Sequence, residues 1–252
     1  MDFMFLTEAE KSSPYVEAFY RTLPQLEHEL AEGIRQEINP ADAVGYDTMD
    51  KMLAPGYLPG ENGWCLLPEG GGYAAINTKL PGISHEKYIW WRQWRRQGDQ
   101  DFQYKLWYPG KHYRFSQELG WIYEDIGRGP EHIFSYGIPS PQEMGLNPEA
   151  LKASGVLSLH TNSFISRPEG ASYETDPMKM VLAHFVREIP GGIELRSRFW
   201  LGYGIANGRL TCLQKEIPRE MPALMADHCA HEMTNLSNLI PMLYDAVQNE
   251  KH

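Results

Sequence analysis

The sequence predicts an α+β fold in which an antiparallel sheet curves around one long helix near the C-terminus. Residues 178–189 and 193–201 each alternate with period two, and Pro190-Gly191-Gly192 joins them as the turn of a β-hairpin. Residues 222–248 repeat their apolar side chains at helical spacing, as in Leu236, Leu239, Ile240 and Leu243. Because such a helix must bury its apolar face, we expect it to pack on the sheet and to leave a cavity between the two.

The first third of the chain differs from the rest in its sequence patterns. Helical patterns are expected over residues 14–36 and 40–53, whereas residues 54–84 are dense in glycine and proline. We therefore divide the chain into an N-terminal, mainly helical region, residues 1–80, and a main domain, residues 81–252, that carries the functional site.

Three further local signals place elements in the main domain. Ser84 can cap an aromatic-faced helix that stops before Gly98. The alternating, aromatic-rich residues 104–115 predict a strand that runs into a loop at Pro109-Gly110. Within the terminal helix, Pro241 is expected to produce a kink.

Composition excludes several classes of function. The formal net charge of −10 and the isoelectric point near 5.4 argue against nucleic acid or an anionic membrane as a partner. No stretch approaches the roughly 18–20 consecutive apolar residues that span a bilayer, and the start does not have the pattern of a signal peptide, so we expect a cytoplasmic protein. Three scattered cysteines are too few for a disulfide framework or a thiolate zinc site.

Candidate metal ligands begin with His228 and Glu232, which lie one helical turn apart and share a helix face. Zinc usually takes three or four protein ligands, so the remaining ones must come from upstream. The best candidates there are His112, near the expected strand end, and Glu143, in a turn-rich segment. His231 is an alternative to His228, and the same spacing also fits a solvated polar patch on an amphipathic helix.

A second histidine is notable for its apolar surroundings. His184 shares one face of the first hairpin strand with Met180, Leu182 and Val186. An ionisable group on such a face needs a partner or a function. The sequence leaves both interpretations open, a hydrogen-bonded core histidine and a residue of the active site.

Four motifs together resemble a known enzyme family. They are Trp90-Trp91-Arg92-Gln93-Trp94, then Tyr104-Lys105-Leu106-Trp107-Tyr108-Pro109 with His112, then Leu195-Arg196-Ser197-Arg198-Phe199-Trp200-Leu201, and finally His228-Cys229-Ala230-His231-Glu232-Met233. The chain resembles, from about residue 54 to 244, the zinc-dependent carbon–carbon hydrolases of the diacetylphloroglucinol hydrolase and phloretin hydrolase family.

The resemblance implies a fold and a metal site. The fold would be a Bet v 1-like helix-grip domain with an added N-terminal region. Zinc would be held by two histidines and two glutamates, which the family's intervals place at His112, Glu143, His228 and Glu232. This correspondence leaves His231 outside the metal site.

The resemblance also implies catalytic residues. The family's catalytic histidine corresponds to His184, and a substrate-binding tyrosine eight residues before the first metal histidine corresponds to Tyr104. With Glu143, these are the candidate catalytic residues. Phe115 stands where the diacetylphloroglucinol enzymes have an asparagine that contacts a ring hydroxyl, so the resemblance leaves the exact substrate open.

The implied reaction is hydrolysis of an acyl group from a polyhydroxylated aromatic ring of the acylphloroglucinol type, by a homodimer. Zinc can polarise a substrate oxygen or activate water for such a reaction. Two alternatives stay open at this point. One is a zinc hydrolase of aryl esters or amides, and the other is a non-enzymatic helix-grip binder of aromatic ligands.

Overall fold

One antiparallel sheet of eight strands forms the centre of the computed structural model, which describes residues 5–172, 174 and 176–249. The order of strands is β1-β2-β8-β7-β6-β5-β4-β3. Their bounds are β1 Gly63–Leu66, β2 Gly72–Pro81, β3 His112–Ser116, β4 Trp121–Asp125, β5 Pro130–Gly137, β6 Val156–Pro168, β7 Met178–Ile189 and β8 Gly192–Leu201. A separate two-stranded ribbon consists of β9 Tyr203–Ala206 and β10 Arg209–Cys212.

The helices are short except for those near the C-terminus. They are α1 Glu8–Lys11, α2 Glu17–Tyr20, α3 His28–Gly33, α4 His85–Trp94, α5 Gln100–Trp107, α6 Pro148–Ala153, α7 Met221–Thr234 and α8 Leu236–Asn249, with 3₁₀ helices at Pro40–Asp42 and Tyr46–Leu53. None of the helices in the described part of the chain is long and apolar enough to cross a membrane.

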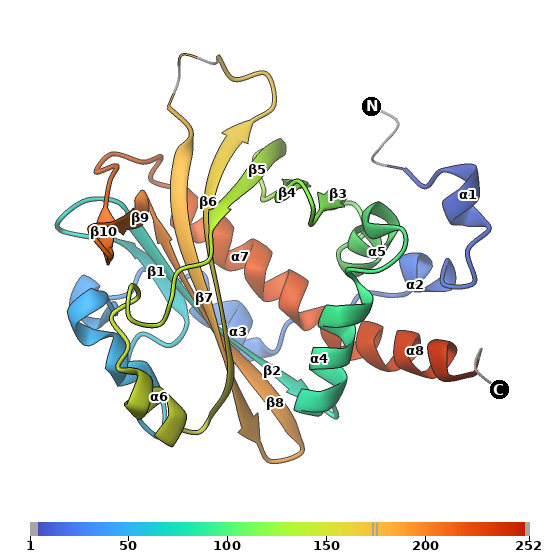
Figure 1. Ribbon diagram of the computed structural model, residues 1–252, viewed down its shortest axis with the longest axis horizontal. Coiled ribbons are helices and arrows are strands. Elements are labelled where there is room, and N and C mark those ends of the chain that lie inside the picture. Colours follow the sequence, from blue (N-terminus) through green and yellow to red (C-terminus); the bar gives the residue numbers. More distant parts are fainter. Residues whose placement is uncertain (1–4, 173, 175, 250–252) are drawn as a thin grey trace.

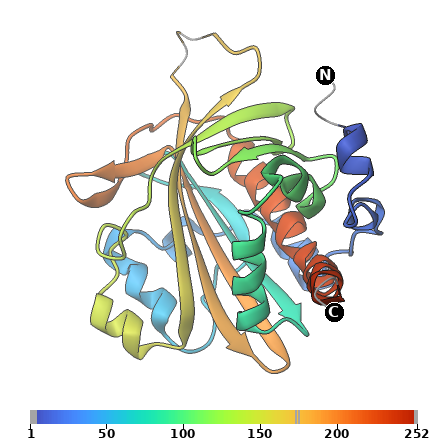
Figure 2. The ribbon, with the colours of Figure 1, turned by 45° about the vertical axis from the view of Figure 1, so that its right-hand side comes forward.

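The sheet has two covered faces. α7 crosses one of them, with α4 and α5 beside it (Figures 1 and 2). Alternate residues of β7 separate accordingly: Met180 and Val186 join the apolar cluster that includes α7, whereas Val181, Ala183 and Phe185 pack on the opposite face. This arrangement confirms the α+β class and explains why β7 is apolar on both sides.

The hairpin predicted between residues 178 and 201 is confirmed. β7 and β8 pair from Ile189 with Gly192 to Met180 with Leu201, which leaves Pro190 and Gly191 as the turn. Proline fixes a negative φ, and Gly191 has a φ of 79°, a value that favours glycine.

Residues 104–115 do not form the continuous strand that their alternation predicts. The side chain of Asp99 accepts a hydrogen bond from the backbone N–H of Phe102 and caps α5, so Tyr104 lies on a helix. β3 begins only at His112. By contrast, the helix predicted after Ser84 is confirmed as α4, with the Ser84 hydroxyl accepting from the N–H of Lys87.

Three other expectations differ from the structure. The helical patterns of residues 14–36 and 40–53 are broken into the short helices given above. The terminal helix is interrupted at Asn235, while Pro241 lies inside α8. The expected boundary between residues 80 and 81 falls inside β2, which pairs with β8 over its whole length and so belongs to the central sheet.

Candidate active site

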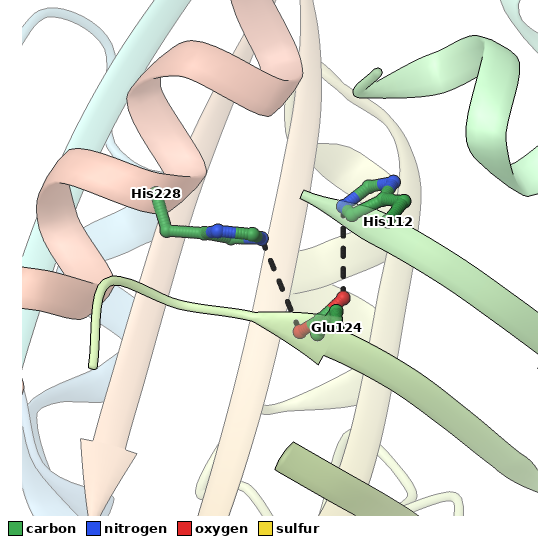
Figure 3. A group of neighbouring side chains, drawn as sticks. All are labelled: His112, Glu124 and His228. Atoms are coloured by element: carbon green, nitrogen blue, oxygen red, sulfur yellow. Dashed lines mark ion pairs between the residues drawn. The ribbon is translucent and has the colours of Figure 1, made fainter. Parts of the chain in front are cut away.

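Two histidines and two glutamates converge where α7 passes the β3–β4 hairpin. His112 opens β3 and is the cross-strand partner of Glu124 in β4, while His228 and Glu232 project from one face of α7. Nε2 of His112 lies 3.6 Å from Oε2 of Glu124 and 3.5 Å from Oε2 of Glu232. Nε2 of His228 lies 3.9 Å from Oε1 of Glu124 and 3.9 Å from Oε2 of Glu232. Figure 3 shows His112, Glu124 and His228 pointing toward one another from three different elements.

The donor atoms of this cluster fit a divalent metal ion. All four residues are buried, and Nε2 of both His112 and His228 has no hydrogen-bond partner among the described residues. Buried polar atoms are almost always paired, so two unpaired imidazole nitrogens facing carboxylates need an explanation. One donor atom each from His112, Glu124 and His228 lies within 4.8 Å of the others. Two nitrogens and two carboxylate oxygens are a donor set that suits zinc.

Burial sets the protonation of the cluster. It lowers the pKa of His112 well below its usual value, with the positive charge of His228 acting in the same direction, and it lowers the pKa of His228 to about 4. Both imidazoles are therefore neutral at pH 7, the form that binds a metal. Burial also raises the pKa of Glu124 to about 7 and, together with the charge of Glu124, that of Glu232 well above its usual value. Two buried carboxyl groups this close favour a cation between them.

Two side chains of helix α5, those of Tyr104 and Trp107, contact residues of the cluster. The hydroxyl of Tyr104 donates a hydrogen bond to Oε2 of Glu124, and its ring stacks on His112 with centroids 4.0 Å apart and planes 4° from parallel. Nε1 of Trp107 donates to the backbone carbonyl of Glu232 over 2.6 Å. These contacts fix the positions of β4 and α7 relative to α5.

The structure places Glu143, the other predicted glutamate ligand, apart from this cluster. The carboxylate of Glu143 accepts hydrogen bonds from N and Oγ of Ser140, both at 2.8 Å, in the loop after β5. Its neighbours Met144 and Leu146 pack on the face of the sheet opposite α7. The glutamate that the structure places between His112 and His228 is Glu124.

The sequence analysis did not single out Glu124. The signal that would have identified Glu124 is the short hairpin of β3 and β4, in which Glu124 pairs directly with His112. His231 points elsewhere on α7, with Nε2 3.8 Å from Oδ1 of Asp227 and its side chain 38% exposed. The structure thus brings together His112, His228 and Glu232 and leaves both Glu143 and His231 outside the cluster.

The cluster opens into a cavity of about 640 Å³ between α4, α5, α7 and the sheet. Its wall includes Tyr104, Phe115 and His184 together with Glu124 and Glu232. This volume is in the range of sites for small organic molecules.

His184 faces the cavity, and a second histidine lies beside it. Nδ1 of His184 is hydrogen-bonded to Oγ of Ser197 over 2.7 Å. Its cross-strand partner on β6 is His160, which also lines the cavity. Burial, followed by the charge of Arg92, lowers the pKa of each histidine to about 3, so both are neutral at pH 7. The sequence analysis missed His160 because its relation to His184 depends on strand register.

The sequence match decides the family. A model described as the DAPG hydrolase PhiG domain matches residues 45–245. The chain belongs to this family. The match includes every residue of the buried cluster and every strand of the eight-stranded sheet.

Three relatives match most of the chain. A phloretin hydrolase of Eubacterium ramulus is 25% identical over 237 residues, which cover 82% of this chain and 80% of that protein. A 2,4-diacetylphloroglucinol hydrolase of a Pseudomonas species is 21% identical over 94% of this chain and 88% of its own length. A second protein of that name, from Pseudomonas protegens, is 22% identical over 79% of this chain and 71% of its own length.

Likeness to solved structures is slight. A protein of Mesorhizobium loti covers 67% of this chain with a TM-score of 0.34 and 11% identity, and a hypothetical protein of Helicobacter pylori covers 68% with a TM-score of 0.36 and 10% identity.

Proposed function

We propose that this protein is a zinc-dependent hydrolase that cleaves the carbon–carbon bond between an acyl group and a polyhydroxylated aromatic ring. The observation that carries the proposal is the buried cluster of His112, Glu124, His228 and Glu232 at a cavity of about 640 Å³. Membership of a family whose relatives are named phloretin hydrolase and 2,4-diacetylphloroglucinol hydrolase supports the reaction class.

The reaction needs two events at one bond. The hydroxyl of water must add to the acyl carbon, which leaves as a carboxylic acid, and the ring carbon must accept a proton as the bond to the acyl carbon breaks. A divalent ion held by the cluster supplies Lewis acidity for a substrate oxygen or for water. Hydroxyl groups on the ring favour this bond cleavage because they stabilise the departing ring carbon as an enol.

His184 is the proposed proton carrier. It is neutral, faces the cavity and is held by Ser197, so it can take the proton released by the attacking water and deliver it to the ring carbon. Tyr104 is the proposed binder of a phenolic oxygen, because it lines the cavity beside Glu124 and is fixed by its stacking on His112.

Two structural proposals accompany the function. The sheet lying around α7 supports a Bet v 1-like helix-grip description of the fold (Figures 1 and 2). We also propose that the protein is a homodimer, as the family resemblance implies.

The direct test combines metal analysis with product analysis. Purified protein should contain about one zinc ion per chain by mass spectrometry, and it should convert 2-acetylphloroglucinol to acetate and phloroglucinol in equal amounts. Phenyl acetate serves as the comparison substrate with an oxygen–acyl bond. Cleavage of phenyl acetate without cleavage of 2-acetylphloroglucinol would replace the proposal with an esterase, and the absence of bound metal from an active enzyme would remove zinc from it.

A further inference from the structure

Three arginines from one short segment line the cavity. Arg92 lies in α4, and Arg95 and Arg96 follow directly after its last residue, Trp94. Arg92 and Arg95 are half-buried and Arg96 is exposed. Three like charges on one wall repel one another, so their joint presence has a cost in the free protein.

Carboxylates do not neutralise these arginines. Among the described residues, the side chain of Arg92 makes one hydrogen bond, from its guanidinium to the hydroxyl of Tyr88 over 3.4 Å. Within the same described part of the chain, no carboxylate forms an ion pair with Arg92, Arg95 or Arg96. The acids of the cavity, Glu124 and Glu232, face the histidines of the buried cluster.

Aromatic rings fix one of these guanidinium groups. The guanidinium carbon of Arg95 lies 5.2 Å from the ring centroid of Trp91, 5.3 Å from that of Trp107 and 5.3 Å from that of Phe115. Such faces attract a cation without neutralising it. Nε of Arg95 is buried and has no hydrogen-bond partner in the described part of the chain.

Three arginines elsewhere in the chain, two of them buried and one half-buried, are paired with carboxylates. Nε of Arg196 lies 2.5 Å from Oε1 of Glu61, and a terminal nitrogen of Arg198 lies 2.8 Å from the same oxygen. Arg187 is likewise paired with Glu194, at 2.5 Å. These three arginines are paired with carboxylates, whereas the cavity arginines are left available to a ligand.

We propose that the substrate carries a carboxylate on its acyl arm and that Arg92, Arg95 and Arg96 receive it. This rests on the proposed function and narrows its substrate class to acylphloroglucinol-type acids. The planar fork of a guanidinium matches the two oxygens of a carboxylate. A cavity of about 640 Å³ has room for the ring at the buried cluster and for an arm that extends toward α4.

The test uses one pair of probes that differ only in charge. They are 4-oxo-4-(2,4,6-trihydroxyphenyl)butanoate, a phloroglucinol with a succinyl arm, and its methyl ester. Binding is measured by quenching of tryptophan fluorescence, since Trp91 and Trp107 line the cavity, and hydrolysis is measured separately as release of phloroglucinol. The acid should bind at least about tenfold more tightly than the ester, because a hydrogen-bonded charge pair is lost in the ester.

Variants assign the preference to the arginines. Arg92→Gln and Arg96→Gln should each weaken binding of the acid about tenfold and leave the ester nearly unchanged, and Arg92→Lys should restore part of the affinity because it keeps the charge. The matched control is Arg219→Gln, which removes the same charge from a side chain that is 74% exposed and outside the cavity. It should change neither affinity.

Two results would overturn the proposal. One is equal affinity of the unaltered protein for the acid and the ester. The other is an equal loss of affinity for both probes in the arginine variants, which would show that the arginines only shape the cavity. Preference for the acid without release of phloroglucinol would support the carboxylate site and reject the proposed reaction. Hydrolysis of both probes without preference for the acid would support the proposed reaction and reject the carboxylate site.

Discussion

Replacement of Glu124 by glutamine should stabilise the metal-free protein at alkaline pH and, at the same time, weaken its binding of zinc. The gain in stability without metal and the loss of zinc affinity have the same cause. Glu124 is 6% exposed and faces the carboxyl group of Glu232 across two neutral histidines, so its negative charge is costly unless a cation is present. Glutamine has nearly the same shape and carries no charge.

The magnitude follows from the pKa of Glu124, which burial raises from its ordinary value of 4.5 to about 7. Between these values the unfolded chain has released the proton and the folded chain still holds it, so the free energy of unfolding falls as pH rises. At about 1.4 kcal/mol per pKa unit, the full loss above pH 7 is about 3 kcal/mol. The variant Glu124→Gln has no carboxyl group to ionise at this position and so keeps this free energy of unfolding. Without metal it should be more stable than the unaltered protein by up to about 3 kcal/mol at pH 8, and it should show little gain at pH 4.

The assay is urea unfolding of protein freed of metal with a chelator, at pH values from 4 to 8, and again with excess zinc. Zinc should remove most of this difference, because a ligand present at 100 times its dissociation constant stabilises the folded state by about 2.7 kcal/mol and the variant binds it less tightly. Zinc affinity should fall by at least roughly 10–100-fold, the loss typical even for residues that only support a metal ligand.

Glu143→Gln is the matched control. It makes the same chemical change at the position that the sequence analysis favoured, where the carboxylate accepts hydrogen bonds from Ser140. It should leave zinc affinity within about twofold of the unaltered protein. If Glu143→Gln lost zinc while Glu124→Gln retained it, the cluster built on Glu124 would be the wrong one. If Glu124→Gln were less stable than the unaltered protein without metal at pH 8, the account of its pKa would fail.

Three further predictions concern catalysis, stability and assembly. His184→Ala should lower turnover by roughly 10²–10⁴ while zinc content stays near one per chain, and near-normal turnover of folded variant on 2-acetylphloroglucinol would make His184 structural. Glu61→Gln should cost about 3–5 kcal/mol in urea unfolding at pH 7, since it leaves Arg196 and Arg198 buried without a carboxylate. These arginines outweigh burial and lower the pKa of Glu61 to about 2, so its contribution is present above pH 4.5 and should disappear as pH falls toward 2. Light scattering should give about twice the chain mass of 28.9 kDa, and a value near 28.9 kDa would refute the homodimer.

Local patterns alone determined several parts of this molecule. Strict alternation with a Pro-Gly turn determined the β7–β8 hairpin, because side chains of a strand must point alternately to its two faces. The step from His228 to Glu232 determined that both would lie on one face of α7. Each of these features depends only on residues close together in the sequence, and pattern reasoning can reach them.

The rest depended on contacts between distant segments. Aromatic alternation around Tyr104 fits a strand as well as a helix, and the cap at Asp99 together with packing of α5 beside the cluster decides for the helix. Glu124 meets His112 only because β3 and β4 pair in one register, and a register shifted by one residue would turn its side chain to the other face. The same holds for His160 beside His184 on β6 and β7. The sequence by itself determined which kinds of side chain the site would contain, whereas strand register, which is a property of the folded sheet, decided which glutamate would face the histidines.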